Sequence, residues 1–248
     1  MNNKLFNVKG FITVITGSAR GIGLELAKGF YDYGSKVIRV DLRLKKEKNY
    51  HFDDYKINLT KNLSVDKFLK KIEKKYGKID VLINNAGIVK QQYKHDLYNE
   101  KILKEIMSVN FIAAYSLSHK ICKIMSKNNK GSIINITSIT AERGFAGNPS
   151  YQISKASLKQ YTKSLANDWG SKNIRANNVC PGYIKTPMTI KNYKVKKLKK
   201  EKIDRMIIKR FGNPSDLLGP CIFLASDASS YITGSDIFVD GGWLAKGI

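Results

Sequence analysis

Short apolar runs alternate with helix-like segments along most of the chain. The clearest runs are Phe11–Thr16, Lys36–Val40, Val81–Ile83, Ser132–Thr137 and Ile174–Val179. Their apolar residues are consecutive, whereas a strand with one face in water alternates apolar and polar residues. Continuous apolar strands separated by helices are typical of a parallel sheet covered on both faces. The sequence therefore predicts an α/β fold with a doubly wound parallel sheet of about seven strands.

Helical periodicity fills the intervals between these runs. Leu63–Tyr76 places apolar residues at helical spacing and is followed by Gly77, a residue that commonly ends helices. Longer helices are expected at Tyr98–Lys127 and Tyr151–Trp169, and a last strand at Asp236–Val239. No linker, repeat or low-complexity tract interrupts the pattern, so residues 1–248 are expected to form a single domain.

The composition narrows the class of partner. The net charge is +24, but all except seven of the 44 basic residues are Lys, and they are spread along the whole chain. Phosphate clamps and base readers favour Arg, so we expect no nucleic-acid partner. No apolar run reaches the roughly 18 residues of a membrane span, so no membrane partner is expected. Cys122, Cys180 and Cys221 lack metal-ligand spacing and predict free thiols in a metal-free cytoplasmic protein.

A glycine-rich turn, Thr16–Gly23, lies between the first strand and a helical segment. In this context glycines let the backbone approach a pyrophosphate, which the free N–H groups of the helix N-terminus then bind. Asp41 ends the second strand, where a carboxylate accepts hydrogen bonds from an adenosine ribose diol and repels a 2′-phosphate. Arg20 and Arg43 favour the phosphate instead. Weighing Asp41 more heavily, we expect NAD as cofactor, with NADP less favoured.

Tyr151 and Lys155 are four residues apart on a predicted helix, so both side chains face the same way. An ammonium group beside a phenol lowers the phenol's pKa toward working pH. Such pairs are common on protein surfaces, but Ser138 lies at the end of a strand 13 residues upstream. Ligands bind at this edge of open α/β sheets. Asn110, a poor helix former, lies in the middle of a predicted helix.

In their order and spacing these motifs resemble the short-chain dehydrogenase/reductase family. The resemblance rests on the glycine turn, on Asn84–Gly87 (NNAG), and on Ser138, Tyr151 and Lys155, and it extends from Gly10 to Leu244. It implies a Rossmann-type fold and a hydride transfer between a nicotinamide cofactor and a secondary alcohol or ketone.

The region from Asn167–Trp169 through Pro181–Tyr183 and the ending Val239–Ala245 are most similar to sugar-acid dehydrogenases of the gluconate and deoxygluconate group. The expected small-molecule substrate is therefore a sugar, a sugar acid or a related polyol. The alternative is a 3-oxoacyl-(acyl-carrier-protein) reductase. A noncatalytic protein that kept the fold is a further alternative, disfavoured because all four reacting positions are intact.

The resemblance also implies roles for these residues. Ser138 and Tyr151 bind the substrate oxygen, and Tyr151 transfers its proton. Lys155 lowers the Tyr151 pKa and binds the nicotinamide ribose, and Asn110 holds a water that relays protons to Lys155. The cofactor-binding residues are expected to be Gly17, Ser18, Arg20, Gly21, Ile22, Gly23, Asp41, Asn58, Leu59, Asn85, Ala86, Gly87, Tyr151, Lys155, Pro181, Gly182, Ile184 and Thr186.

Two larger features complete the expectation. Residues 187–212 are expected to form a substrate lid, whose many lysines are either a solvated helix face or a basic rim that attracts an anionic substrate. The helices at Tyr98–Lys127 and Tyr151–Trp169 carry surplus apolar residues, and relatives pair these helices. A homotetramer or homodimer is therefore expected.

Overall fold

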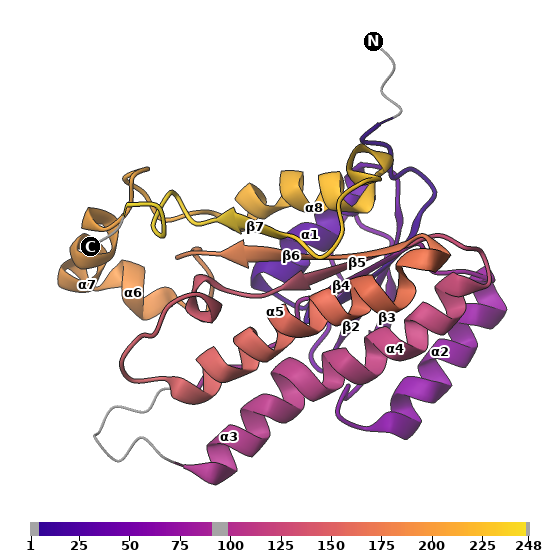
Figure 1. Ribbon diagram of the computed structural model, residues 1–248, viewed down its shortest axis with the longest axis horizontal. Coiled ribbons are helices and arrows are strands. Elements are labelled where there is room, and N and C mark those ends of the chain that lie inside the picture. Colours follow the sequence, from indigo (N-terminus) through magenta and orange to yellow (C-terminus); the bar gives the residue numbers. More distant parts are fainter. Residues whose placement is uncertain (1–4, 91–98, 247–248) are drawn as a thin grey trace.

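A seven-stranded, all-parallel sheet forms the centre of the molecule (Figure 1). The computed structural model describes residues 5–90 and 99–246. Across the sheet the strand order is β3-β2-β1-β4-β5-β6-β7. The strands are β1 (Ile12–Thr16), β2 (Lys36–Asp41), β3 (Asp53–Lys56), β4 (Val81–Asn84), β5 (Gly131–Ile136), β6 (Ile174–Pro181) and β7 (Asp236–Val239). The predicted doubly wound parallel sheet is confirmed.

Helices cover both faces of this sheet (Figure 1). One face packs against α2 (Asn62–Tyr76), α4 (Ala113–Ser126) and α5 (Pro149–Trp169). The other packs against α1 (Gly21–Asp32) and α8 (Leu218–Ala225). Because both faces are covered, β1, β4 and β5 are buried along their whole length, as their continuous apolar runs predicted.

The long helix expected at Tyr98–Lys127 is divided in the structure. Its start lies outside the described residues, and α3 (Glu100–Met107) is followed by a π-helical turn at Ser108–Ile112 and then by α4. The segment after Pro214 likewise starts as a short 3-10 helix, Pro214–Leu217, before α8. Neither 5–90 nor 99–246 contains a helix with the length and apolar content needed to cross a bilayer.

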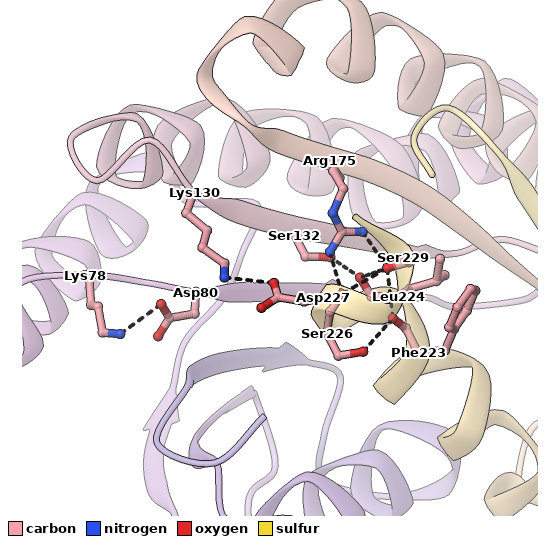
Figure 2. A network of polar contacts seen from close by, with 10 residues as sticks. All are labelled: Lys78, Asp80, Lys130, Ser132, Arg175, Phe223, Leu224, Ser226, Asp227 and Ser229. Atoms are coloured by element: carbon pink, nitrogen blue, oxygen red, sulfur yellow. Dashed lines mark hydrogen bonds and ion pairs between the residues drawn. The ribbon is translucent and has the colours of Figure 1, made fainter. Parts of the chain in front are cut away.

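Polar contacts at one end of the sheet are structural. At the amino-terminal ends of the strands, polar contacts hold α8 against β5 and β6 (Figure 2). Arg175 donates to Ser229 Oγ at 2.8 Å and to the Ser226 carbonyl at 3.2 Å. Lys130, just before β5, pairs with Asp227 at 2.8 Å. These contacts at the amino-terminal ends of the strands are structural, and the candidate site is expected at the turns that follow the carboxyl ends.

A row of buried amides crosses the α5 face of the sheet. Asn84, Asn135, Asn178 and Asp236 are register partners on the four adjacent strands β4 to β7. Asn84 donates to Asn135 at 2.8 Å, and Asn135 donates to Thr162 of α5 at 2.7 Å. Thr162 donates to Asn178 at 2.6 Å, and Asn178 donates to Asp236 at 2.7 Å. This amide row supplies partners for polar groups that would be costly to bury alone.

We predict that Asn135→Ala lowers the free energy of unfolding by about 2–4 kcal/mol, because the Asn84 amide and the Thr162 hydroxyl each lose a buried partner. Urea denaturation at pH 7 measures the change. Asn128→Ala, on an exposed turn, is the matched control and should shift the value by less than about 0.5 kcal/mol. Equal effects of the two substitutions would contradict the structural role of the amide row.

Candidate functional site

The glycine turn after β1 is packed against the turn after β4. A Cβ added at Gly23 would lie 2.3 Å from the Gly17 carbonyl oxygen and 2.4 Å from Asn85 Nδ2. The same Asn85 amide donates to the Thr16 carbonyl at 2.9 Å and to the Gly17 carbonyl at 3.0 Å. Gly17 itself has φ +66°, and a Cβ there would lie 2.7 Å from Ala86 Cα. Two of the predicted cofactor motifs therefore form one rigid unit.

This unit has the properties of a phosphate site. Helix α1 follows the turn directly, has no side-chain cap and no acidic residue in its first turn, so its N-terminal N–H groups are available to an anion. Ser18 Oγ is buried and has no partner among the described residues. Thr186, in the loop after β6, lies about 3.6 Å from where a Cβ of Gly21 would be. The residues present thus fit a dinucleotide pyrophosphate.

Asp41 lies at the edge of this turn, as predicted. One oxygen of its carboxylate accepts from the Ala19 N–H at 3.1 Å, and the other accepts from the Arg43 N–H at 3.0 Å. The side chains of Arg20 and Arg43 are exposed at the same edge. Two backbone donors therefore offset part of the negative charge that was expected to repel a 2′-phosphate.

Asn58 and Leu59, two of the expected cofactor-binding residues, follow β3 and make contacts within the protein. The Asn58 Oδ1 atom accepts from the Thr60 N–H at 3.0 Å and from the Thr60 hydroxyl at 2.8 Å. Leu59 packs against the hydrophobic core under α2. A cofactor that hydrogen-bonds to Asn58 Oδ1 would have to share this oxygen with Thr60, whose two donors form a short local turn with Asn58.

Lys155 and Tyr151 lie one turn apart on α5, and the net shift of the Tyr151 pKa is upward. Lys155 Nζ donates to the Ile136 carbonyl at 2.7 Å and lies 5.8 Å from the centroid of the Tyr151 ring. Burial lowers the pKa of Lys155 to about 8. Burial also raises the pKa of Tyr151 to about 12, and an interaction with the Ser138 side chain offsets only part of this. Desolvation is the largest influence on the Tyr151 pKa in this structure, and the lowering expected from Lys155 stays a prediction.

Ser138 extends from the carboxyl end of β5. Its hydroxyl oxygen accepts from the Thr140 N–H at 3.2 Å, and its side chain also forms a hydrogen bond with that of Tyr151. Ser138 and Tyr151 are the two hydroxyl groups that the structure brings together, as the sequence predicted.

Asn110 lies in the π-helical turn and joins α5 to the segment after β4. Its Oδ1 accepts from the Ile88 N–H at 2.8 Å, and its Nδ2 donates to the Ile88 carbonyl and to Ser154 Oγ, both at 3.0 Å. Ser154 in turn donates to the Tyr151 carbonyl at 2.7 Å. These bonds explain a poor helix former at this position. Ser154 was not singled out from the sequence, because a serine inside a helix carries no distinctive signal.

The loop after β6 is held against β7. Pro181 is the last residue of β6, and the Gly182 N–H donates to the Val239 carbonyl at 3.0 Å. Ile184 is buried, and the Thr186 N–H donates to Thr189 Oγ1 at 3.1 Å. The loop that was expected to contact the nicotinamide is thus ordered beside the glycine turn.

The segment between Ser138 and Tyr151 is anchored to α5 by contacts that the sequence did not reveal. The Phe145 N–H donates to Gln152 Oε1 at 2.7 Å, and Gln152 Nε2 donates back to the Phe145 carbonyl at 2.6 Å. Glu142 forms an ion pair with Lys159, which also pairs with Asp236 at 3.2 Å. Since the spacing of these residues follows no motif, only the fold could show them.

The expected lid region forms two short helices, α6 (Ile190–Lys194) and α7 (Lys196–Asp204). A cavity of about 380 Å³ lies between the segment that follows α7 and the ends of β6 and β7. Tyr183, Met206 and Ile208 are among the residues that line it.

We predict that Lys155→Met stabilises the protein more at pH 7 than at pH 10. The Lys155 ammonium is lost near pH 8 in the folded protein and near pH 10.5 in the unfolded chain. Between these values the unfolded chain binds more protons, so the stability of the wild type rises with pH and the advantage of the variant shrinks by about 2–3 kcal/mol.

Urea denaturation of both proteins at pH 7 and pH 10 measures this difference. The exposed Lys70→Met variant is the control and should show no such change. A difference between Lys155→Met and wild type that is independent of pH would show that Lys155 has an ordinary pKa.

Comparison with known proteins places these motifs in a family. A family model described as enoyl-(acyl carrier protein) reductase matches residues 17–244. The 2-dehydro-3-deoxy-D-gluconate 5-dehydrogenase of Dickeya dadantii (strain 3937) is 34% identical over 249 residues, which cover 97% of this chain and 98% of the relative. The 3-oxoacyl-(acyl-carrier-protein) reductase of Thermotoga maritima is 35% identical over 244 residues, which cover 95% of this chain and 98% of the relative.

A solved structure has nearly the same fold. The gluconate 5-dehydrogenase of Burkholderia cenocepacia J2315, in complex with NADP and tartrate, has a TM-score of 0.92 and 29% identity, with 98% of each chain covered. The fold agrees with these matches. The chain belongs to the short-chain dehydrogenase/reductase family of nicotinamide-dependent oxidoreductases.

Proposed function

We propose that the protein transfers a hydride between a nicotinamide cofactor and the secondary alcohol or ketone of a sugar acid or a related polyol. The observation that carries this proposal is a set of buried polar atoms without partners, on residues close to Ser138 or Tyr151 in the sequence or packed against Ile139. Thr140 Oγ1, Asn148 Oδ1 and Trp243 Nε1 are buried and have no hydrogen-bond partner among the described residues. Buried polar atoms without partners are rare in folded proteins, and a substrate rich in hydroxyl groups would supply partners here.

The site residues would share the chemistry as follows. The Ser138 hydroxyl donates to the substrate oxygen, and the Tyr151 phenol gives its proton to a carbonyl or takes one from an alcohol. Lys155 contacts the nicotinamide ribose, and Asn110 holds a water on the proton path to Lys155. When bound, the nicotinamide supplies or accepts the hydride.

The relatives support the same substrate class. The Dickeya dadantii relative is named for a deoxygluconate, and the Burkholderia cenocepacia structure holds tartrate, a hydroxylated dicarboxylate. The second candidate is a 3-oxoacyl-(acyl-carrier-protein) reductase, which the Thermotoga maritima relative and the description of the family model favour.

We propose NADP as the cofactor. The NADP in the Burkholderia cenocepacia structure favours it over the NAD expected from Asp41. Arg20 and Arg43 are exposed beside Asp41, whose charge is partly offset by two backbone donors, so the edge can accommodate a 2′-phosphate. The remaining cofactor contacts would come from the glycine turn, the segment after β4 and the loop after β6.

We further propose a single domain over residues 1–248 with a substrate lid at 187–212, working as a homotetramer or homodimer. Ile112, Tyr115 and Ile153, from the π-helical turn, α4 and α5, are about half exposed, which supports an apolar contact with a second copy. Three buried free cysteines support a cytoplasmic location.

A panel assay tests the proposed function. Purified protein is incubated with NAD or NADP and with sugar acids, polyols, nucleotide sugars or 3-oxoacyl thioesters, and the nicotinamide absorbance is followed. Turnover of sugar acids with a kcat/KM well above that of the thioesters supports the proposal. The reverse order would establish the acyl-carrier-protein reductase instead.

We predict that Tyr151→Phe reduces kcat by about 100- to 10,000-fold and leaves cofactor affinity within a few-fold, because the ring still packs but has no transferable proton. Cofactor binding is followed by fluorescence titration and turnover by absorbance. Tyr33→Phe, on the exposed end of α1, is the control and should keep full activity. A Tyr151→Phe enzyme with half its activity would remove Tyr151 from the mechanism.

We predict that the wild-type enzyme turns over with NADP, and that Asp41→Ser raises the NADP-to-NAD ratio of kcat/KM by at least about 10-fold. The substitution removes a carboxylate that repels the 2′-phosphate and binds the ribose diol, and charge-assisted bonds of this kind contribute about 1.5–3 kcal/mol. Steady-state kinetics with both cofactors measure the ratio. Asp32→Ser, on the exposed end of α1, should leave it unchanged, and an unchanged ratio in Asp41→Ser would show that Asp41 does not select the cofactor.

A further inference from the structure

Two cationic side chains lie over a pair of neighbouring aromatic rings beside the Ser138 segment. The guanidinium carbon of Arg143 is 5.6 Å from the centroid of the Trp243 ring, and Lys202 Nζ is 5.3 Å from that of Tyr183. The two ring centroids are 6.4 Å apart. Arg143 comes from the segment after β5 and Lys202 from α7, so the two cations reach the aromatic pair from different parts of the chain.

Among the described residues, Arg143 and Lys202 have no carboxylate partner, although other cations in this region do. Arg210, for comparison, binds both oxygens of Asp216, at 2.6 and 3.0 Å. Within 5–90 and 99–246, the side chains of Arg143 and Lys202 form neither hydrogen bonds nor ion pairs. Their donors are therefore available to a bound anion, while the ring beneath each cation restricts its position.

The third donor of this group is the indole of Trp243. Its side chain is only 4% exposed, and its Nε1 has no partner in the described structure. Trp243 packs in one buried cluster with Met206 and with Ile139, the residue after Ser138. An unpaired N–H at this depth is unfavourable unless a ligand accepts from it.

We propose that Arg143, assisted by Lys202 and by the indole N–H of Trp243, binds the carboxylate of the substrate. This inference rests on the proposed sugar-acid chemistry and assigns the residues that select the acid. A guanidinium presents two parallel N–H donors that match the two oxygens of a carboxylate, and the resulting bonds are charge-assisted. A neutral polyol or an acyl thioester offers no such group, so these residues discriminate between substrate classes.

Kinetics with D-gluconate and its neutral counterpart D-glucitol test the assignment in the wild type and in Arg143→Leu. The substitution should raise the KM for D-gluconate by about 10- to 100-fold and change kinetic constants for D-glucitol by less than about two-fold. Arg143→Lys, which keeps the charge but loses the paired donors, should fall between them. Trp243→Phe, which keeps the ring and loses the N–H, should raise the KM for D-gluconate by a few-fold.

Lys70→Leu removes the same charge from the exposed face of α2 and is the matched control. It should leave the KM for D-gluconate unchanged, which separates a local contact from the effect of net charge. If Lys70→Leu raised this KM as much as Arg143→Leu does, or if Arg143→Leu affected both substrates equally, the carboxylate assignment would be overturned.

Binding of tartrate to the protein–NADP complex, measured by isothermal titration calorimetry, separates this inference from the proposed function. At least about 10-fold weaker binding of tartrate by Arg143→Leu supports the carboxylate site even if the panel assay finds no sugar acid turned over. Equal binding by wild type and variant, or no binding by either, overturns the carboxylate site whatever the outcome of the panel assay.

Discussion

The absence of a side chain at Gly23 is the constraint on which the candidate site depends. The first turn of α1 packs against the Gly17 carbonyl at a distance that leaves no room for a Cβ, and the Asn85 amide fills the remaining space. This contact fixes the N-terminus of α1 beside the segment after β4. Because Asn110 binds that segment and also Ser154 of α5, the phosphate end and the reacting end are parts of one hydrogen-bonded framework.

The parts of the site that the sequence predicted are those governed by local geometry. Two side chains four residues apart on a helix lie on the same face. A glycine turn between a strand and a helix places the helix N-terminus beside the turn. The carboxyl ends of parallel strands all meet at one edge, so Ser138 could be placed near Tyr151 without a structure. Six of the seven strands followed from the apolar pattern, and their bounds moved by two residues or fewer, whereas β3 (DDYK) has no apolar run.

The parts that the sequence did not predict depend on burial and on contacts between distant residues. The pKa of Tyr151 is set by desolvation, which spacing does not report, and the Asn58 oxygen is used by a turn two residues long. Arg143 and Trp243 are a hundred residues apart in the chain, and the sequence around each of them does not indicate that they are in contact. Lysines on the lid suggested an attraction for anions, but only the fold distinguishes a side chain held over a ring from a solvated one.

The row of amides across β4 to β7 also bears on how the sheet assembles. Parallel neighbours are joined by long crossovers, so no tight turn sets their alignment, and apolar strands buried on both faces tolerate a shift of register. A shift of one residue in β5 would turn Asn135 away from the row and toward the α1 and α8 face, and would put Ile134 or Ile136 in its place. Asn135 thus favours the native register of β5, because a shifted β5 would leave the amide without its polar partners in the row.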